Sequence, residues 1–235
     1  MIRCTAVSKT YQDGRGRFDA VHDIHLSVAK GEFVVLAGPS GSGKTTLLNL
    51  LGGLDRASGG SILFAGQDIT RLSPAALADV RLRKIGFVFQ SYNLLPVLSA
   101  FENVEFVLRL QGVARAEREA RARAVLEQVG LTRELDRRPA AMSGGQQQRV
   151  AVARALVTNP AMVLADEPTA NLDSKTAEGL LELMYRLNET TGTTFVISTH
   201  DPLIINSANR VVTLKDGEIA SDVLTVEVSE ECLTA

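Results

Sequence analysis

The segment GPSGSGKT, at residues 38–45, constrains the fold of this chain more than any other feature. It matches the pattern G-x-x-x-x-G-K-[S/T], and it lies between an apolar run at 33–38 and a helical pattern with four leucines between 47 and 51. Its glycines let the backbone curl so that successive N–H groups point inward, and the following helix adds its positive N-terminal end. The segment therefore predicts an anion-binding loop between a buried strand and a helix.

This loop carries the side chains that a nucleoside triphosphate requires. Lys44 is expected to reach the β and γ phosphates, and the hydroxyl of Thr45 is expected to bind Mg²⁺. A nucleoside triphosphate with Mg²⁺ is therefore the predicted ligand. The residues expected to contact the nucleotide here are Gly38, Pro39, Ser40, Gly41, Ser42, Gly43, Lys44, Thr45 and Thr46.

An acidic segment, DEPTANLD at 166–173, directly follows the apolar run at 161–165. Carboxylates at the end of a buried strand need a positive partner. A metal ion that accompanies the phosphates bound by the loop would be that partner. Asp166 is expected to hold Mg²⁺ directly or through water, and Glu167 to orient and polarise the attacking water as general base. A solvated loop carboxylate is the alternative for Glu167 alone, but it does not account for the pair.

Short β-branched runs alternate with helical patterns, which predicts an α/β fold with a largely parallel sheet covered by helices. The predicted strands are 33–38, 61–66, 85–90, 161–165, 193–198 and 210–214. A helix at 73–84 is expected to begin at a serine cap followed by proline, and residues 215–218 are expected to form a tight turn. The tail beyond Ser221 is acidic and its sequence is uninformative.

From about residue 91 to residue 142 the strand signals stop, and two helical segments that end in glycine follow. We interpret them as a helical insertion in the α/β core. The second segment is rich in arginine, which could suggest an RNA-binding helix. However, Glu117 precedes Arg121 and Glu119 precedes Arg123 by four residues, the favourable order for ion pairs within a helix. We therefore expect an exposed, self-neutralised helix face.

Composition limits the size and the partners of the protein. With 235 residues, 45% of them apolar, and a formal net charge of −2, the chain suits one large domain and offers no basic face for nucleic acid. Cys4 and Cys232 have no metal-binding spacing and are expected to be reduced thiols. Neither a signal-peptide pattern nor a run of about 18 apolar residues is present, so we expect a soluble, cytoplasmic protein.

The segment MSGGQQQR, at 142–149, resembles the signature motif of ATP-binding cassette (ABC) ATPases, with Met142 in place of the usual leucine. The resemblance extends to an ordered set of motifs over nearly the whole chain. They are the phosphate loop, a glutamine at Gln90, the signature at 143–147, the acidic strand end at 166–167, NLD at 171–173 and a histidine at His200. The order and spacing are more specific than any single motif, and they imply that the nucleotide is ATP.

The resemblance implies a role for each matching residue. Tyr11 would stack on adenine, Gln90 would contact Mg²⁺ and the attacking water, and Glu167 and His200 would complete the catalytic set. The implied metal contacts are Thr45, Gln90 and Asp166. The residues that would meet a second copy or its nucleotide are Ser143, Gly144, Gly145, Gln146 and Asp173. The glutamine run at 146–148 also fits a helical surface.

The resemblance also implies the architecture of a phosphate-loop NTPase core, with a mostly parallel sheet, an antiparallel β region near the N-terminus and an inserted helical subdomain. Residues 1–90 and 159–235 would form the core, and about 91–158 would form the subdomain that carries the signature, within one domain at 1–235. Ser-Gly-Gly at the start of a helix is itself an anion site. Two copies are therefore expected to exchange signatures across a two-fold axis, with ATP between them.

Without a membrane segment, the family's transport role requires an integral membrane permease subunit, which would hold the chain at the cytoplasmic face of the inner (cell) membrane. The apolar run within residues 92–101 is interpreted as part of a groove for a cytoplasmic helix of that subunit. Packing inside the helical subdomain is the alternative.

Two segments, GGLDRASGG at 52–60 and FVFQSYNLLPVLSAFENVEF at 87–106, look most like the lipoprotein-release and macrolide-export branch (LolD-like and MacB-like). The alternative is a non-transport ABC ATPase that regulates a transmembrane partner, as in cell-division signalling. A DNA-repair ABC ATPase is disfavoured, because Lys44 and Ser143 lie too close in sequence for its long coiled-coil insertion. A small-molecule kinase would lack the signature.

Overall fold

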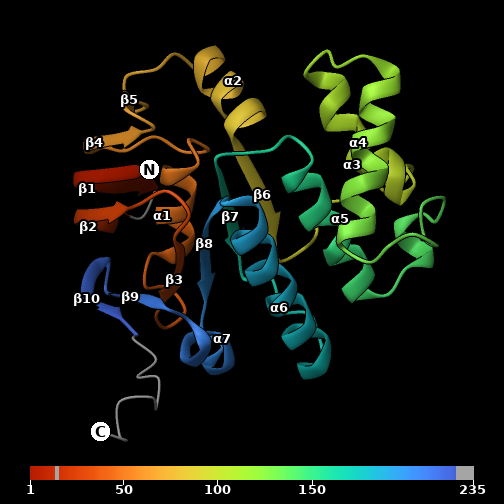
Figure 1. Ribbon diagram of the computed structural model, residues 1–235. Helices are drawn as coiled ribbons and strands as arrows, with labels where there is room; N and C mark the ends of the chain where they lie inside the picture. Colours follow the sequence, from red (N-terminus) through yellow and green to blue (C-terminus); the bar gives the residue numbers. More distant parts are fainter. Residues whose placement is uncertain (14–15, 226–235) are drawn as a thin grey trace, which may run out of the picture.

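The computed structural model describes residues 1–13 and 16–225, which form an α/β fold (Figure 1). Its strands are β1 (Ile2–Asp13), β2 (Gly16–Val28), β3 (Phe33–Ala37), β4 (Gly59–Phe64), β5 (Gln67–Asp68), β6 (Ile85–Phe89), β7 (Met162–Asp166), β8 (Thr194–Thr199), β9 (Arg210–Lys215) and β10 (Glu218–Leu224). Its helices are α1 (Lys44–Leu51), α2 (Pro74–Lys84), α3 (Ala100–Leu110), α4 (Arg115–Gln128), the 3-10 helix η1 (Pro139–Ala141), α5 (Gly144–Leu156), α6 (Ser174–Thr191) and α7 (Pro202–Ser207). The six predicted strands are confirmed, with ends that agree to within two residues.

The larger sheet has six strands in the order β10-β9-β3-β8-β7-β6. All of its neighbouring strands are parallel except β10, which pairs antiparallel with β9. Every residue of β3 and β8 is buried, because the sheet is covered on both faces. This two-sided burial explains why these strands are continuous apolar runs in the sequence. The carboxyl ends of the parallel strands meet along one edge of the sheet.

The smaller sheet, in the order β2-β1-β4-β5, is antiparallel throughout, as the family resemblance implied for the N-terminal region. The predicted strand at 61–66 belongs to this sheet, as β4. The tight turn at 215–218 is confirmed: Asp216 and Gly217 both have positive φ, at 50° and 84°, between the paired residues Lys215 and Glu218. Beyond Ser221, where the sequence is uninformative, β10 continues to Leu224 along the edge of β9.

Local side-chain caps explain where several helices begin. Ser73 accepts a hydrogen bond from the N–H of Ala76, and Pro74 follows it, as predicted for α2. Asp173 caps α6 by accepting from the N–H of Thr176. By contrast, α1 begins at Gly43, which has no capping side chain. The start of α1 is therefore open to a ligand.

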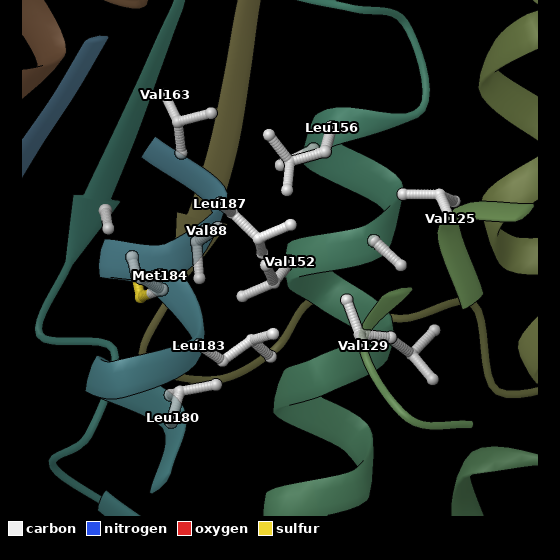
Figure 2. Close-up of a cluster of buried hydrophobic side chains, with 14 of the residues drawn as sticks. Val88, Val125, Val129, Val152, Leu156, Val163, Leu180, Leu183, Met184 and Leu187 are labelled. Carbon is white, nitrogen blue, oxygen red and sulfur yellow. The ribbon is translucent and has the colours of Figure 1, made fainter. Parts of the chain in front are cut away.

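Two apolar clusters cover the two faces of the parallel sheet, because alternate strand residues point to opposite sides. Val34 and Leu36 of β3 pack in one cluster with α1 and the antiparallel sheet, whereas Phe33 and Val35 pack in the other. Figure 2 shows part of the second cluster, in which α5 lies between α6 on one side and the end of α4 on the other. The labelled side chains are Val88, Val125, Val129, Val152, Leu156, Val163, Leu180, Leu183, Met184 and Leu187.

Helix α5 connects the helical region to the sheet. Its backbone approaches β6 so closely that a Cβ on Gly86 would lie 2.5 Å from the carbonyl oxygen of Ala155. All elements between residues 91 and 158 are helical, and α3 and α4 lie on the side of α5 away from the sheet (Figure 1). The proposed boundaries of a subdomain at these residues stay a prediction. In the described part of the chain, no helix combines the length and the apolar character needed to cross a membrane.

The predicted ion pairs on α4 are half right. Arg121 Nη1 lies 3.3 Å from Glu117 Oε1, as expected. The predicted pair of Glu119 with Arg123 is wrong, because Glu119 bonds Arg115 on the preceding turn at 2.6 Å. Arg123 instead lies 5.0 Å from the ring centre of Phe101, where the face of the ring attracts the guanidinium group.

Candidate functional site

Four segments that the sequence singled out lie at one edge of the parallel sheet. The loop at 38–45 follows β3, Gln90 follows β6, the pair at 166–167 ends β7, and His200 follows β8. The strand register aligns these ends, since Ala37 pairs with Thr199 and Asp166 pairs with both Phe89 and Ser198. The carboxyl edge of a parallel sheet is where α/β proteins bind ligands.

The conformation of the loop at 38–45 depends on its glycines. Gly38 and Gly43 have positive φ, at 144° and 101°, which L side chains rarely adopt. A Cβ on Gly38 would lie 2.2 Å from the carbonyl oxygen of Leu214, and one on Gly43 would lie 2.6 Å from that of Ala20. Glycine is therefore required at both positions, and the loop is packed against β9 and β2.

Inside the loop, polar groups are held in position for an anion. Lys44 is only 6% exposed, and its Nζ donates to the carbonyl oxygens of Gly38 and Pro39 at 2.8 and 3.0 Å. The hydroxyl of Ser42 is buried without a hydrogen-bond partner. With the uncapped start of α1, these groups form a cradle that fits phosphate oxygens.

The carboxylate of Asp166 lies beside the loop. Its Oδ1 accepts hydrogen bonds from Thr45 Oγ1 at 3.0 Å and from Ser198 Oγ at 2.5 Å. Thr45 and Asp166 thus lie together, as predicted, and both are the hard oxygen donors that Mg²⁺ prefers. Sequence analysis missed Ser198, because only the pairing of β7 with β8 reveals its position opposite Asp166.

The next residue, Glu167, is held in an unusual backbone conformation. Its φ is 46°, and its N–H donates to the carbonyl oxygen of Ser198 at 3.1 Å. Its Oε1 lies 2.9 Å from Nδ1 of His200. The side chain of Glu167 is 17% exposed and that of His200 is 67% exposed, so the histidine lies on the solvent side of the carboxylate. Two of the three residues predicted to be catalytic, Glu167 and His200, are therefore in direct contact.

A cleft of about 590 Å³ runs along these groups. This volume lies within the usual range of small-molecule sites. Most of the predicted nucleotide and catalytic residues of the core line it, together with two residues of β2 that sequence analysis missed. The lining residues are Phe18, Ala20, Pro39, Ser40, Gly41, Gly43, Lys44, Thr45, Thr46, Gln90, Glu167, Ala170 and His200.

Tyr11 is not among the residues that line this cleft; it lies on β1, directly opposite Phe18. Its hydroxyl donates to Asp55 at 2.8 Å, and the ammonium group of Lys9 bonds the same carboxylate at 2.6 Å. Burial, with the bond to Asp55, raises the pKa of Tyr11. Burial alone would raise the pKa of Asp55, but the bonds from Lys9 and Tyr11 outweigh it and lower that pKa. Sequence analysis missed both Lys9 and Asp55.

The signature residues Ser143, Gly144, Gly145 and Gln146 lie at the start of α5, and none of them lines the cleft. The side chain of Ser143 accepts from the N–H of Gln146 at 3.2 Å, and the side chain of Gln146 accepts from the N–H of Ser143 at 3.0 Å. This reciprocal arrangement is a capping box. Met142 is buried, so the apolar role of the usual leucine is kept.

The segment after β6 is attached to α5. Gln148 is fully buried, and its Nε2 lies 3.5 Å from the carbonyl oxygen of Phe89, so the interpretation of the glutamine run as helical surface is wrong at this residue. Arg154 donates to the carbonyl oxygens of Tyr92 and Asn93 at 2.8 and 2.5 Å. Burial lowers the pKa of Arg154. Sequence analysis found neither contact, because both join residues distant in the chain.

The predicted contact residue Asp173 serves as the cap of α6. Hydrogen bonds from the side chain and the N–H of Thr176 lower its pKa. Two residues earlier, the side-chain amide of Asn171 donates to the carbonyl oxygen of Gln90 at 3.0 Å. The segment NLD therefore lies against the end of β6.

Comparison with known proteins agrees with this geometry. A family model described as ABC transporter matches residues 21–170. The chain is 50% identical over 213 residues to an uncharacterized ABC transporter ATP-binding protein of Thermotoga maritima, covering 91% of each chain. It is 48% identical over 221 residues to the macrolide export ATP-binding/permease protein MacB of Syntrophobacter fumaroxidans, covering 93% of this chain but 31% of that protein.

Among solved structures, the chain is similar to the ATP-binding cassette MJ0796, described as a dimeric post-hydrolysis state bound to ADP and Pi. The TM-score is 0.88 and the identity 42%, over 95% of this chain and 98% of that one. The family model covers more than half of the chain, and the relative from Thermotoga maritima matches it over nearly its whole length. The chain therefore belongs to the ABC transporter family, among its ATP-binding proteins.

Proposed function

We propose that this chain hydrolyses ATP with Mg²⁺ and so powers a separate membrane subunit of an ABC transporter. The observation that carries the proposal is the meeting of Lys44, Thr45, Gln90, Glu167 and His200 in one cleft. A phosphate cradle, a metal-binding position and a water-activating carboxylate are the parts that phosphoryl transfer to water needs.

The loop would bind the triphosphate through its backbone and through Lys44. The uncapped start of α1 and the unpartnered hydroxyl of Ser42 offer hydrogen bonds that nothing else in the described chain takes. Lys44 Nζ, held inside the loop by two carbonyl oxygens, would turn its donors to the β and γ phosphates when the nucleotide binds. Gly38, Pro39, Ser40, Gly41, Gly43, Thr45 and Thr46 would complete the contact.

Thr45 at the start of α1, Asp166 at the end of β7 and Gln90 after β6 would hold Mg²⁺ through their oxygen atoms. When bound, the ion would supply positive charge that offsets the negative charge of the phosphates. The bond from Ser198 holds the Asp166 carboxylate toward Thr45. Ser198 therefore acts as a positioning residue in this proposal.

Glu167 would take the proton of the attacking water, with the carboxylate oriented by His200 at 2.9 Å. His200, on the solvent side, would also contact the γ-phosphate. Ser143, Gly144, Gly145 and Gln146 do not line their own cleft, so they would cap the γ-phosphate bound to a second copy. Asp173 would lie at the contact between copies. The dimeric description of the solved relative supports this arrangement.

A second cleft, of about 390 Å³, would receive a cytoplasmic helix of the membrane subunit. Its walls are mainly apolar, and they come from α2, β6, α3 and α5. The lining residues are Leu54, Arg81, Leu82, Ile85, Gly86, Phe87, Phe89, Asn93, Val107, Arg154, Ala155 and Thr158. Within the predicted apolar run, Asn93 lines the cleft, Leu94 packs against the core, and Leu95 and Val97 are exposed. The groove therefore involves β6 and α2 more than that run.

The similarity to MacB supports an export or mechanotransmission type, in lipoprotein release or in macrolide or peptide efflux. Such a partner would hold the chain at the cytoplasmic face of the inner membrane.

Glu167→Gln tests the hydrolytic part of the proposal. The amide keeps the shape of the side chain but cannot accept the proton of water, so hydrolysis should fall by about 10²–10⁴-fold while ATP still binds. Loss of a negative charge near the γ-phosphate should also favour a dimer in Mg-ATP, visible by size-exclusion chromatography and absent with ADP. Near-normal hydrolysis would remove Glu167 from the role of base.

Charged substitutions test the groove. Leu54→Glu places a carboxylate on its apolar wall, so co-purification with the membrane subunit should be lost while the isolated chain still binds ATP. Leu224→Glu is the matched control, because Leu224 is exposed on β10 and does not line the groove. A complex that survives Leu54→Glu and a second substitution, Val107→Glu, would place the interface elsewhere.

A further inference from the structure

A pocket of about 240 Å³ lies between α6 and α7, and it shares no lining residue with the nucleotide cleft or with the groove on α2, β6, α3 and α5. Its apolar lining comes from the buried side chains of Ala177, Leu181 and Ile204 and from the half-buried ring of Tyr185. The volume is below the range of about 300–1,000 Å³ that is usual for small-molecule sites. The pocket therefore fits an apolar side chain of a protein partner better than a free metabolite.

Tyr185 fixes the shape of this pocket. Its ring stacks on that of Phe33 in β3, with 3.8 Å between the ring centres. Its hydroxyl donates to the carbonyl oxygen of Ser207, at the end of α7, at 3.1 Å. Tyr185 thus joins α6 both to the parallel sheet and to α7. Because the pocket is already formed, a partner would bind without the entropy cost of ordering its walls.

The rim of the pocket is acidic. Glu178 and Glu182 are exposed and lie four residues apart, on the same face of α6, and Asp201 immediately precedes α7. In the part of the chain that the structure describes, neither glutamate forms an ion pair, although Arg186 follows Glu182 by four residues, the order that favours one. The two glutamates are therefore available to a positively charged partner.

We propose that this pocket binds a basic cytoplasmic segment of the membrane subunit. One apolar side chain of the segment enters between α6 and α7, and flanking lysine or arginine residues meet Glu178 and Glu182. The inference rests on the proposed function, since it requires the membrane subunit. Cytoplasmic segments of membrane proteins carry an excess of lysine and arginine, so they supply the charge that complements this rim. A second attachment besides the groove would strengthen the complex through avidity.

Charge disfavours the two occupants that this chain itself could supply. Residues 226–235 contain three glutamates and neither lysine nor arginine, so the rim would repel them. A two-fold contact of the pocket with the same pocket of a second copy would bring identical carboxylates together. A basic segment of another protein is the occupant that the charges favour.

The test titrates the isolated chain with overlapping fluorescent peptides that cover the cytoplasmic segments of the co-purified membrane subunit, and it measures anisotropy. At least one basic peptide should bind the wild type, more weakly as salt is added. Glu178→Lys/Glu182→Lys replaces attraction by repulsion at two positions, so it should weaken that peptide by about 5- to 100-fold. Glu127→Lys/Glu189→Lys is the matched control, because it makes the same charge change at exposed glutamates outside the pocket.

A second comparison separates this pocket from the groove. The peptide that depends on the two glutamates should bind Leu54→Glu as well as the wild type, and replacement of its apolar residue by serine should abolish binding. Unchanged ATP affinity and melting temperature would show that the double variants are folded.

Several results would overturn the inference. If no peptide binds, or if none depends on Glu178 and Glu182, the membrane subunit does not occupy this pocket. If the charge reversal disrupts the ATP-dependent dimer of Glu167→Gln, a second copy covers the pocket. If a basic peptide binds only after residues 226–235 are deleted, the chain's own tail covers it. A wild-type chain that co-purifies with no membrane subunit overturns the proposed function, and the inference with it.

Discussion

The phosphate loop and the signature segment are both glycine-containing helix starts, yet they are built in opposite ways. Helix α1 begins at Gly43, which has positive φ and no capping side chain. Helix α5 begins at Ser143, whose side chain accepts from the N–H of Gln146 while the Gln146 side chain accepts from the N–H of Ser143. The first helix start has no capping side chain, whereas the second is capped by two side chains of its own.

The glycines of the two segments also serve different purposes. In the phosphate loop, Gly38 and Gly43 supply backbone conformations that place N–H groups around an anion. In the signature, Gly144 and Gly145 are helical, and they permit close packing: added Cβ atoms would lie 2.9 Å from the Tyr92 hydroxyl and 2.4 Å from a methyl of Thr176. In the proposed function, the loop binds the nucleotide of its own chain, whereas the signature meets the nucleotide of a second copy.

Lys44→Ala should produce the largest effect, because it removes the one ammonium group inside the open cradle. Charge-assisted hydrogen bonds are worth about 1.5–3 kcal/mol each, so loss of two should weaken Mg-ATP binding by roughly 10²–10⁴-fold in a titration. Lys30→Ala, at an exposed lysine, should change nothing. Full ATP affinity in Lys44→Ala would show that the phosphate loop does not bind the nucleotide as proposed.

Asp166→Asn should have a smaller effect that depends on the metal. The substitution removes one negative charge beside Thr45, so ATP affinity in Mg²⁺ should fall by about 10- to 100-fold, with little change in EDTA. Asp79→Asn is a suitable control, since Asp79 is an exposed carboxylate paired with Arg83. An equal loss with and without Mg²⁺ would show that Asp166 supports the loop and does not serve the metal.

The sequence predicts the phosphate loop and the acidic strand end better than the residues that pack around them. The phosphate loop and the acidic strand end are local patterns, and the parallel strands bring them together without further information. The position of Ser198 depends on strand register, which places it opposite Asp166 in the parallel sheet. Register between distant strands leaves no local trace in the chain.

The burial of individual polar side chains is a second property that the local sequence pattern does not reveal. Gln148 lies in a polar run, yet it is fully buried against the end of β6, where its amide can reach the Phe89 carbonyl. Arg154 likewise reaches across to the segment after Gln90. In both cases a long side chain reaches a backbone carbonyl at or just after the end of β6, and only the packing of α5 on β6 brings them together.

Ser143→Ala should have the smallest effect, and it separates capping from ligand binding. Loss of a serine cap costs about 0.5–2 kcal/mol of unfolding free energy, measurable by urea denaturation. Ser73→Ala removes a similar cap from α2 and should lower stability by a comparable amount. If the signature acts only on the nucleotide of a second copy, Ser143→Ala should keep monomer ATP affinity within about twofold while weakening dimer formation in the Glu167→Gln background. Ser73→Ala should leave that dimer unchanged. A loss of monomer ATP affinity in Ser143→Ala would mean that the signature reaches the cleft of its own chain. The contrast between the uncapped start of α1 and the capped start of α5 would then no longer separate their functions.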